Sequence, residues 1–75
     1  MNSAQKKKQL TKTDRHIADA KGLIARQRKV LARTLAVGYP SELAETTLNA
    51  LEGSLRMLKQ HRERGLAELN RRPAE

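Results

Sequence analysis

Val37-Gly38-Tyr39-Pro40-Ser41-Glu42 decides the fold, because it is the one tight group of turn-forming residues between two long helical patterns. Gly38 can adopt the left-handed backbone conformation that ends a helix. Pro40 cannot continue that helix, because it lacks a backbone N–H and disfavours helical geometry at Tyr39. Ser41 can cap a second helix, with Pro40 at the first position of that helix as the alternative. The chain therefore reverses at Gly38, Pro40 and Ser41.

The pattern before this turn predicts a helix over residues 13–37. Large aliphatic residues recur every seven residues, the spacing of a coiled-coil seam, at Leu10, Ile17, Ile24 and Leu31. The seam positions between them are small or polar, which favours close approach of a second helix.

Residues 1–12 carry four lysines and no acidic residue, and Leu10 is their only large aliphatic residue beyond Met1. This composition predicts a flexible basic N-terminal arm, because it offers too little apolar surface to bury. An arm that becomes ordered on a partner is the alternative. Thr11 and Thr13 compete as caps of the helix that follows.

The pattern after the turn predicts a second helix over residues 42–70 and a C-terminal tail over residues 71–75. Its apolar residues step by alternating fours and threes through Ala44, Leu48, Leu51, Leu55 and Leu58. Pro73 disfavours helical geometry beyond this point.

These patterns predict an all-α fold, a two-helix antiparallel hairpin of the coiled-coil type. The expected core consists of Ile17, Ile24, Leu31, Leu48, Leu51, Leu55 and Leu58. Folding the chain at the turn brings oppositely charged residues to similar heights along the two helices. The expected pairs are Arg33 with Glu45, Arg26 with Glu52, and Asp19 with Lys59.

Each helix carries an apolar stripe that is wider than one partner helix can cover. The additional apolar residues lie beside the seam at Leu23, Val30, Val37, Leu43 and Met57. They predict self-association into a homodimeric four-helix bundle, with docking on another helical protein as the alternative.

The net charge of +8 is concentrated in the N-terminal half of the chain. Candidate phosphate contacts are Lys6, Lys7, Lys8, Arg26, Arg28, Lys29 and Arg33. They indicate a nucleic-acid-binding accessory protein as the alternative function. The competing interpretation is that these residues only solvate the outer faces of a helical bundle.

Composition also argues against several classes of protein. The chain has no Cys, a single aromatic residue and no apolar run approaching the roughly 20 residues of a membrane span. We therefore expect a cytoplasmic protein with no membrane span. No pattern supports a catalytic site, a cofactor or a small-molecule substrate.

His16 and His61 flank the seam from opposite helices, and with Asp19 or Glu63 they could approach a divalent metal. Two histidines without a committed third ligand are a weak signal, however. We therefore predict no metal site and interpret both residues as half-exposed helix histidines.

Residues 14–69 resemble a group of short helical-hairpin proteins from soil-dwelling alphaproteobacteria, a family of unknown function. The shared motifs are Arg15-His16-Ile17-Ala18, Ala25-Arg26-Gln27-Arg28, the turn glycine Gly38, the stretch Leu48–Leu58 and the pair His61-Arg62. Tyr39-Pro40-Ser41 departs from the His-Asp-Thr usual in that turn. The resemblance implies a hairpin fold and no particular chemistry.

Overall fold

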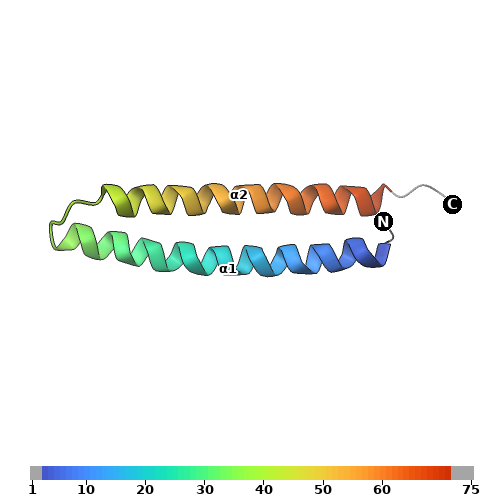
Figure 1. The fold of residues 1–75 in the computed structure, drawn as a ribbon, viewed down its shortest axis with the longest axis horizontal. Coiled ribbons are helices and arrows are strands. Elements are labelled where there is room, and N and C mark those ends of the chain that lie inside the picture. The colour runs from blue at the N-terminus through green and yellow to red at the C-terminus, as the bar shows by residue number, and fades with distance from the viewer. Residues whose placement is uncertain (1–2, 72–75) are drawn as a thin grey trace.

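The computed structural model describes residues 3–71, which form two antiparallel helices joined by a short turn. Helix α1 spans Ser3–Ala36 and helix α2 spans Glu42–Asn70. The helices lie side by side along their whole length (Figure 1), forming a rod with Cα extents of 62 × 14 × 14 Å. The predicted all-α hairpin is confirmed, and α2 has the predicted bounds.

The turn ends α1 in a Schellman motif. Gly38 has the left-handed φ of 78°, and its N–H donates to the carbonyl of Leu35 at 3.1 Å. The N–H of Tyr39 donates to the carbonyl of Thr34, also at 3.1 Å. These two bonds satisfy carbonyls that the end of a helix leaves without partners.

Helix α2 begins at Glu42, so Pro40 is not its first residue. Ser41 occupies the position before the first helical residue, and its carbonyl accepts the N–H of Glu45 at 2.9 Å. Its hydroxyl donates to the Glu45 carboxylate and caps no backbone N–H. Glu42 and Glu45 lie in the first turn, where negative charge is favourable.

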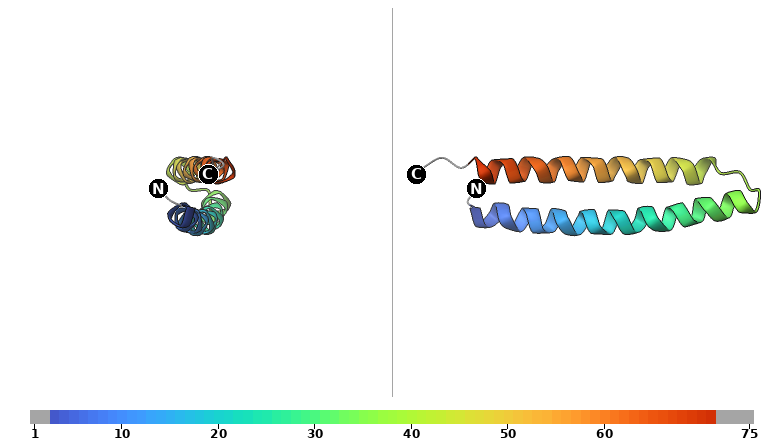
Figure 2. Two further views of the ribbon diagram at one scale, coloured as in Figure 1. Left: turned by 90° about the vertical axis from the view of Figure 1, so that its right-hand side faces the viewer. Right: turned by 180° about the vertical axis from the view of Figure 1, so that it is seen from behind.

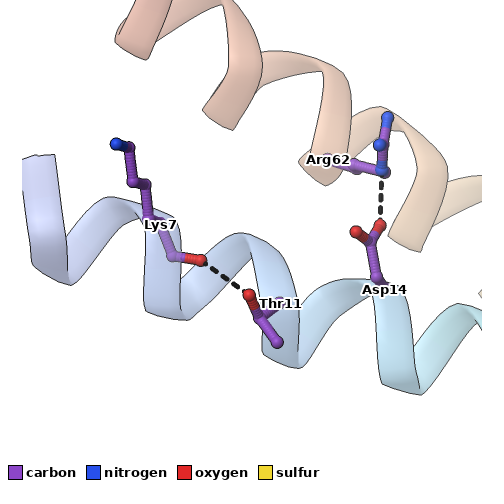
Figure 3. Close-up of polar contacts among 4 residues, drawn as sticks. All are labelled: Lys7, Thr11, Asp14 and Arg62. Atoms are coloured by element: carbon purple, nitrogen blue, oxygen red, sulfur yellow. Dashed lines mark hydrogen bonds and ion pairs between the residues drawn. The ribbon is translucent and has the colours of Figure 1, made fainter.

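The predicted flexible arm is wrong for residues 3–12, because α1 begins at Ser3 rather than at residue 13. Residues 1–2 of that arm lie outside the described part. Ser3, Lys6 and Leu10 continue the seam spacing and are partly buried. Neither candidate threonine caps the helix. Thr13 is buried in the seam, and the Thr11 hydroxyl donates to the Lys7 carbonyl at 3.1 Å (Figure 3).

The seam is narrow and lacks a deep core. Its most buried residues, between 5% and 9% exposed, all belong to α1: Thr13, Ile17, Ala20 and Ile24. The expected core residues Leu31, Leu48, Leu51, Leu55 and Leu58 are half-buried. Along α2 itself no residue is buried. Two helices alone therefore shield each other on one side only.

At the open end, opposite the turn (Figure 2), Gly65 of α2 leaves room for the side chain of Leu10 on α1. A Cβ placed on Gly65 of α2 would lie 3.1 Å from Cδ2 of Leu10 on α1. Nearer the turn, the Gln27 amide donates to the backbone carbonyl of Ala44 at 3.1 Å. A hydrogen bond across the seam helps to fix the register of the two helices.

The three ion pairs within residues 3–71 are not those expected from height alone. Lys6 pairs with Glu68 at 2.8 Å, Arg28 with Glu52 at 3.1 Å, and Arg62 with Asp14 (Figure 3). Glu52 thus pairs with Arg28 instead of Arg26. The expected pairs Arg33–Glu45 and Asp19–Lys59 do not form among the described residues.

Candidate functional site

The two long sides of the hairpin differ in chemistry. One side, which we call the ion-pair face, carries Asp14, Arg28, Glu52 and Arg62 in their two ion pairs. Asp14 and Arg28 are two heptads apart on α1, so they share one side of the helix. These four groups neutralise one another in pairs, whereas Lys21, Lys59 and Glu63 line a groove on the same face and make no ion pair within residues 3–71.

The opposite side carries apolar residues that have no partner in the hairpin. On α1, Leu23, Val30 and Val37 recur every seven residues and are 44%, 47% and 56% exposed. On α2, Leu43 and Met57 are 80% and 70% exposed. Ala50 lies midway between these two residues and is also exposed. These six residues define the apolar face.

Both helices contribute to this same side of the rod. Met57 of α2 lines one groove together with His16 of α1. His16 precedes Leu23 by one heptad and therefore shares its helix side. The apolar residues fall into successive layers towards the turn, beginning with Leu23 and Met57 and ending with Val37 and Leu43. The apolar face thus occupies the turn half of the rod.

The open half of the same side is a groove of about 760 Å³. We call it the histidine groove, because His16 and His61 both line it, as their positions on opposite helices suggested. Lys12 and Arg64 line it as well. Sequence reasoning missed these two cations, because residue 12 was assigned to an arm outside the helix.

The described residues offer no metal centre at this groove. Glu63, a candidate third ligand, lines a groove on the ion-pair face instead, and Asp19 is not among the residues lining the histidine groove. Within residues 3–71 no group of three or more His, Cys, Asp or Glu side chains could hold an ion.

The seven candidate phosphate contacts fall into two classes. Lys6 and Arg28 are engaged in ion pairs with Glu68 and Glu52. The other five are exposed and make no ion pair within the described residues: Lys7, Lys8, Arg26, Lys29 and Arg33.

Four of the five unpaired residues belong to a longer row of basic residues on α1. Lys8, Arg26, Lys29 and Arg33 continue a spacing of fours and threes that also includes Lys12 and Arg15. These six residues form an exposed basic stripe along α1, and its member Lys12 also lines the histidine groove. Asp19 and Gly22 interrupt the stripe in its middle. Lys12 and Arg15 were missed because the stripe appears only once α1 is continuous from Ser3.

Lys6 is the main influence on the pKa of Glu68 at the open end of the hairpin. The hydrogen bond from its ammonium group, and then its charge, lower the pKa of Glu68 below the ordinary value for a glutamate. The positive charges of Arg71 and His61 act in the same direction. Glu68 is therefore ionised and committed to Lys6 at neutral pH.

No protein-family model matches the chain, and comparison with curated proteins and with solved structures finds no similar protein. The resemblance to the alphaproteobacterial hairpins therefore stays a prediction. Neither α1 nor α2 combines the length and the apolar character that crossing a membrane would require.

Proposed function

We propose that this protein is a non-enzymatic helical-hairpin interaction protein, which associates with a second copy through the apolar face to form a four-helix bundle. The observation that carries the proposal is the seven-residue recurrence of exposed apolar residues on one side of both helices. Leu23, Val30 and Val37 repeat on α1 as Leu43, Ala50 and Met57 repeat on α2. Matching heptad spacing on two neighbouring helices is typical of a bundle interface.

The exposed surface of one hairpin supports the same proposal. The chain exposes 6107 Å², whereas a compact monomer of 8.4 kDa exposes about 4,600 Å². The difference of about 1,500 Å² exceeds the roughly 800 Å² that each partner buries in a standard interface. Pairing two hairpins through the apolar face would therefore give the chain the shared core that α2 lacks.

The dimensions of the rod support this argument. Its radius of gyration is 17.3 Å, against about 11 Å for a compact domain of 75 residues. A second hairpin on the apolar face would thicken the rod and cover residues that now face water. Apolar side chains in such a patch favour association, because leaving them in water costs about 25 cal/mol per Å².

Sedimentation equilibrium over a range of concentrations tests the proposal. We expect a mass of twice 8.4 kDa at tens of micromolar. Val30→Glu places a charge in the apolar face and should return the mass to that of one chain. A mass of one chain for the unmodified protein, with full helicity by circular dichroism, would rule out self-association and leave another helical protein as the partner.

Leu35 provides a matched control, because it is 59% exposed but lies at the heptad position of Arg28, on the ion-pair face. Leu35→Glu should leave the dimer intact. Equal loss of the dimer in Val30→Glu and Leu35→Glu would mean that added charge, rather than this particular face, controls association.

The basic stripe supports a second candidate function, the binding of nucleic-acid phosphates through α1. Arg26, Lys29 and Arg33 are exposed, on one side and unpaired within residues 3–71. Phosphate contacts of this kind lose affinity steeply as salt rises. Titration with duplex DNA and structured RNA at about 50 and 200 mM salt would measure that loss. Absence of binding at the lower salt would reject this function.

Two double variants separate a specific basic stripe from general positive charge. Arg26→Gln with Lys29→Gln should weaken binding strongly. Arg56→Gln with Lys59→Gln also removes two exposed, unpaired cations, but from α2. If the two variants lose affinity equally, net charge alone accounts for the binding.

A further inference from the structure

The histidine groove has a composition that neither the apolar face nor the basic stripe explains. It opens between the two helices in the open half of the rod and has a volume of about 760 Å³. Four basic side chains line it, two from each helix: Lys12 and His16 from α1, and His61 and Arg64 from α2. The groove thus exists only when the hairpin is closed.

Among residues 3–71, no carboxylate lines this groove. Lys12 and Arg64 have no ion pair within residues 3–71, so their charges are available to a ligand. Glu68 lines the adjoining groove with His61 and is already engaged by Lys6. The charged groups that line these two grooves with the histidines are Lys12, Arg64, Lys6 and the neutralised Glu68, and Asp19 lies one helical turn from His16 on α1.

Neutral hydrogen-bond donors surround these cations. The amides of Gln9 and Gln60 and the hydroxyls of Thr13 and Ser54 also line the groove. Guanidinium, ammonium, imidazolium and amide groups together suit an oxyanion with several acceptor oxygens. Phosphate is the biological oxyanion that such donor sets most often bind.

We propose that the histidine groove binds a phosphate group, held between Lys12 and His16 of α1 and His61 and Arg64 of α2. Binding requires both helices, so the ligand stabilises the closed hairpin by an amount that grows with the logarithm of its concentration above Kd. The site shares Lys12 with the basic stripe, but His16, His61 and Arg64 lie outside the stripe, and the last two belong to the other helix. Met57 of the apolar face also lines the groove, but none of the four proposed phosphate contacts belongs to that face.

Histidine makes the binding dependent on pH. Protonated imidazole carries a positive charge and two N–H donors, so it attracts an anion more strongly than neutral imidazole does. Phosphate monoesters also gain a proton as the pH falls, with a second pKa of about 6. A phosphodiester keeps its charge, and it is therefore the appropriate probe for the pH dependence.

Nuclear magnetic resonance titration of the full chain tests the site directly. We expect inorganic phosphate and ATP to shift the imidazole signals of both His16 and His61 at low salt. A short oligonucleotide should bind more tightly at about pH 6 than at about pH 7.5. Vesicles with and without phosphatidic acid, compared with ATP, show whether the phosphate comes from a lipid headgroup or from a free nucleotide. Unmoved imidazole signals with every probe would overturn the proposal.

Matched variants decide whether the groove or general charge binds the ligand. Lys12→Gln and Arg64→Gln should each lower the affinity for ATP about five- to tenfold. Lys29→Gln and Arg33→Gln remove the same charge outside the groove and should change it less than about twofold. Equal losses in the two sets would overturn the proposal.

The double variant His16→Gln with His61→Gln should remove the pH dependence of oligonucleotide binding. A pH dependence that survives this double variant would show that the histidines are not part of the site. All these side chains are at the surface, and circular dichroism would verify that each variant keeps its helices. The mass of the Arg64→Gln variant should be unchanged, so that failure of the phosphate site and failure of self-association are distinguishable.

Discussion

Nζ of Lys6 lies 2.8 Å from Oε2 of Glu68, a contact between residues 62 positions apart in the sequence. It joins the second turn of α1 to the last turn of α2 and closes the open end of the hairpin. Both side chains remain partly exposed, so the pair acts mainly by holding the first turns of α1 in place rather than by adding much stability.

Glu68→Gln should therefore loosen the start of α1 without unfolding the hairpin. The amide removes the charge that Lys6 contacts, and we expect faster amide hydrogen exchange in residues 3–10 while residues 17–31 stay protected. Glu63→Gln is the matched control, because Glu63 is exposed and makes no ion pair among the described residues. Equal loosening in the two variants would contradict this role of the pair.

Acid should have the same local effect as Glu68→Gln. The pKa of Glu68 is lowered in the folded chain, so its contribution is fully present above the ordinary value of 4.5. That contribution is lost as the pH falls through the lowered folded value, where the carboxylate takes up a proton. Amide chemical shifts of residues 3–10, followed from neutral to acidic pH, should change in the unmodified protein but not in Glu68→Gln over the same range.

Gly38→Val should destabilise the hairpin by about 1–2 kcal/mol or more, because a β-branched residue resists the left-handed conformation. Gly38 has a φ of 78°, and a Cβ added to it would meet no neighbouring atom within 4 Å, so the penalty comes from the backbone alone. Gly38→Asn should cost less, because asparagine tolerates this region. Thermal melting would rank the three proteins, and equal melting temperatures would contradict the assigned turn.

The two helical glycines should respond in different ways. Gly22 has open space around it, and Gly22→Ala should raise the free energy of unfolding by about 1 kcal/mol through helix propensity. Gly65→Leu should instead lower stability, because Leu10 already lies against the position of its Cβ. Urea denaturation measures both, and a stabilising Gly65→Leu would mean that the helices can separate there freely.

Ile24→Ala should cost about 2 kcal/mol or more, since Ile24 is the most buried residue, 5% exposed, and its methyl groups fill the middle of the seam. Leu35→Ala removes an aliphatic side chain that is 59% exposed and should change stability by less than about 0.5 kcal/mol. Equal losses of stability in Ile24→Ala and Leu35→Ala would show that the seam contributes no more to stability than the surface does.

The turn and the second helix could be predicted because their signals are local. Gly38, Pro40 and Ser41 fix where the chain reverses, and the apolar step pattern of α2 runs without interruption from Ala44 to Leu58. The start of α1 was missed because the lysine-rich composition of residues 3–12 suggested disorder. Leu10 and Lys6 nonetheless continue the seam, and the partners that hold them, Gly65 and Glu68, are remote in sequence.

Ion pairing was mispredicted for a related reason. Height along the rod follows from residue number, but pairing also needs both side chains on the same side of the seam. Arg28 shares the heptad position of Asp14 on the ion-pair face and reaches Glu52. Arg26 lies at the same height but belongs to the basic stripe and points away. Position around each helix, rather than height alone, therefore separates the three faces of this molecule.

The pairing of Lys6 with Glu68 also suggests a way to permute the chain circularly. It brings the first turns of α1 beside the last turns of α2, at the end of the rod farthest from Gly38. A circular permutant could join these two ends with a short linker and open the chain between Tyr39 and Pro40. The same seam would then be formed with α2 first and α1 second, so the order in which the helices are synthesised is not what specifies this hairpin.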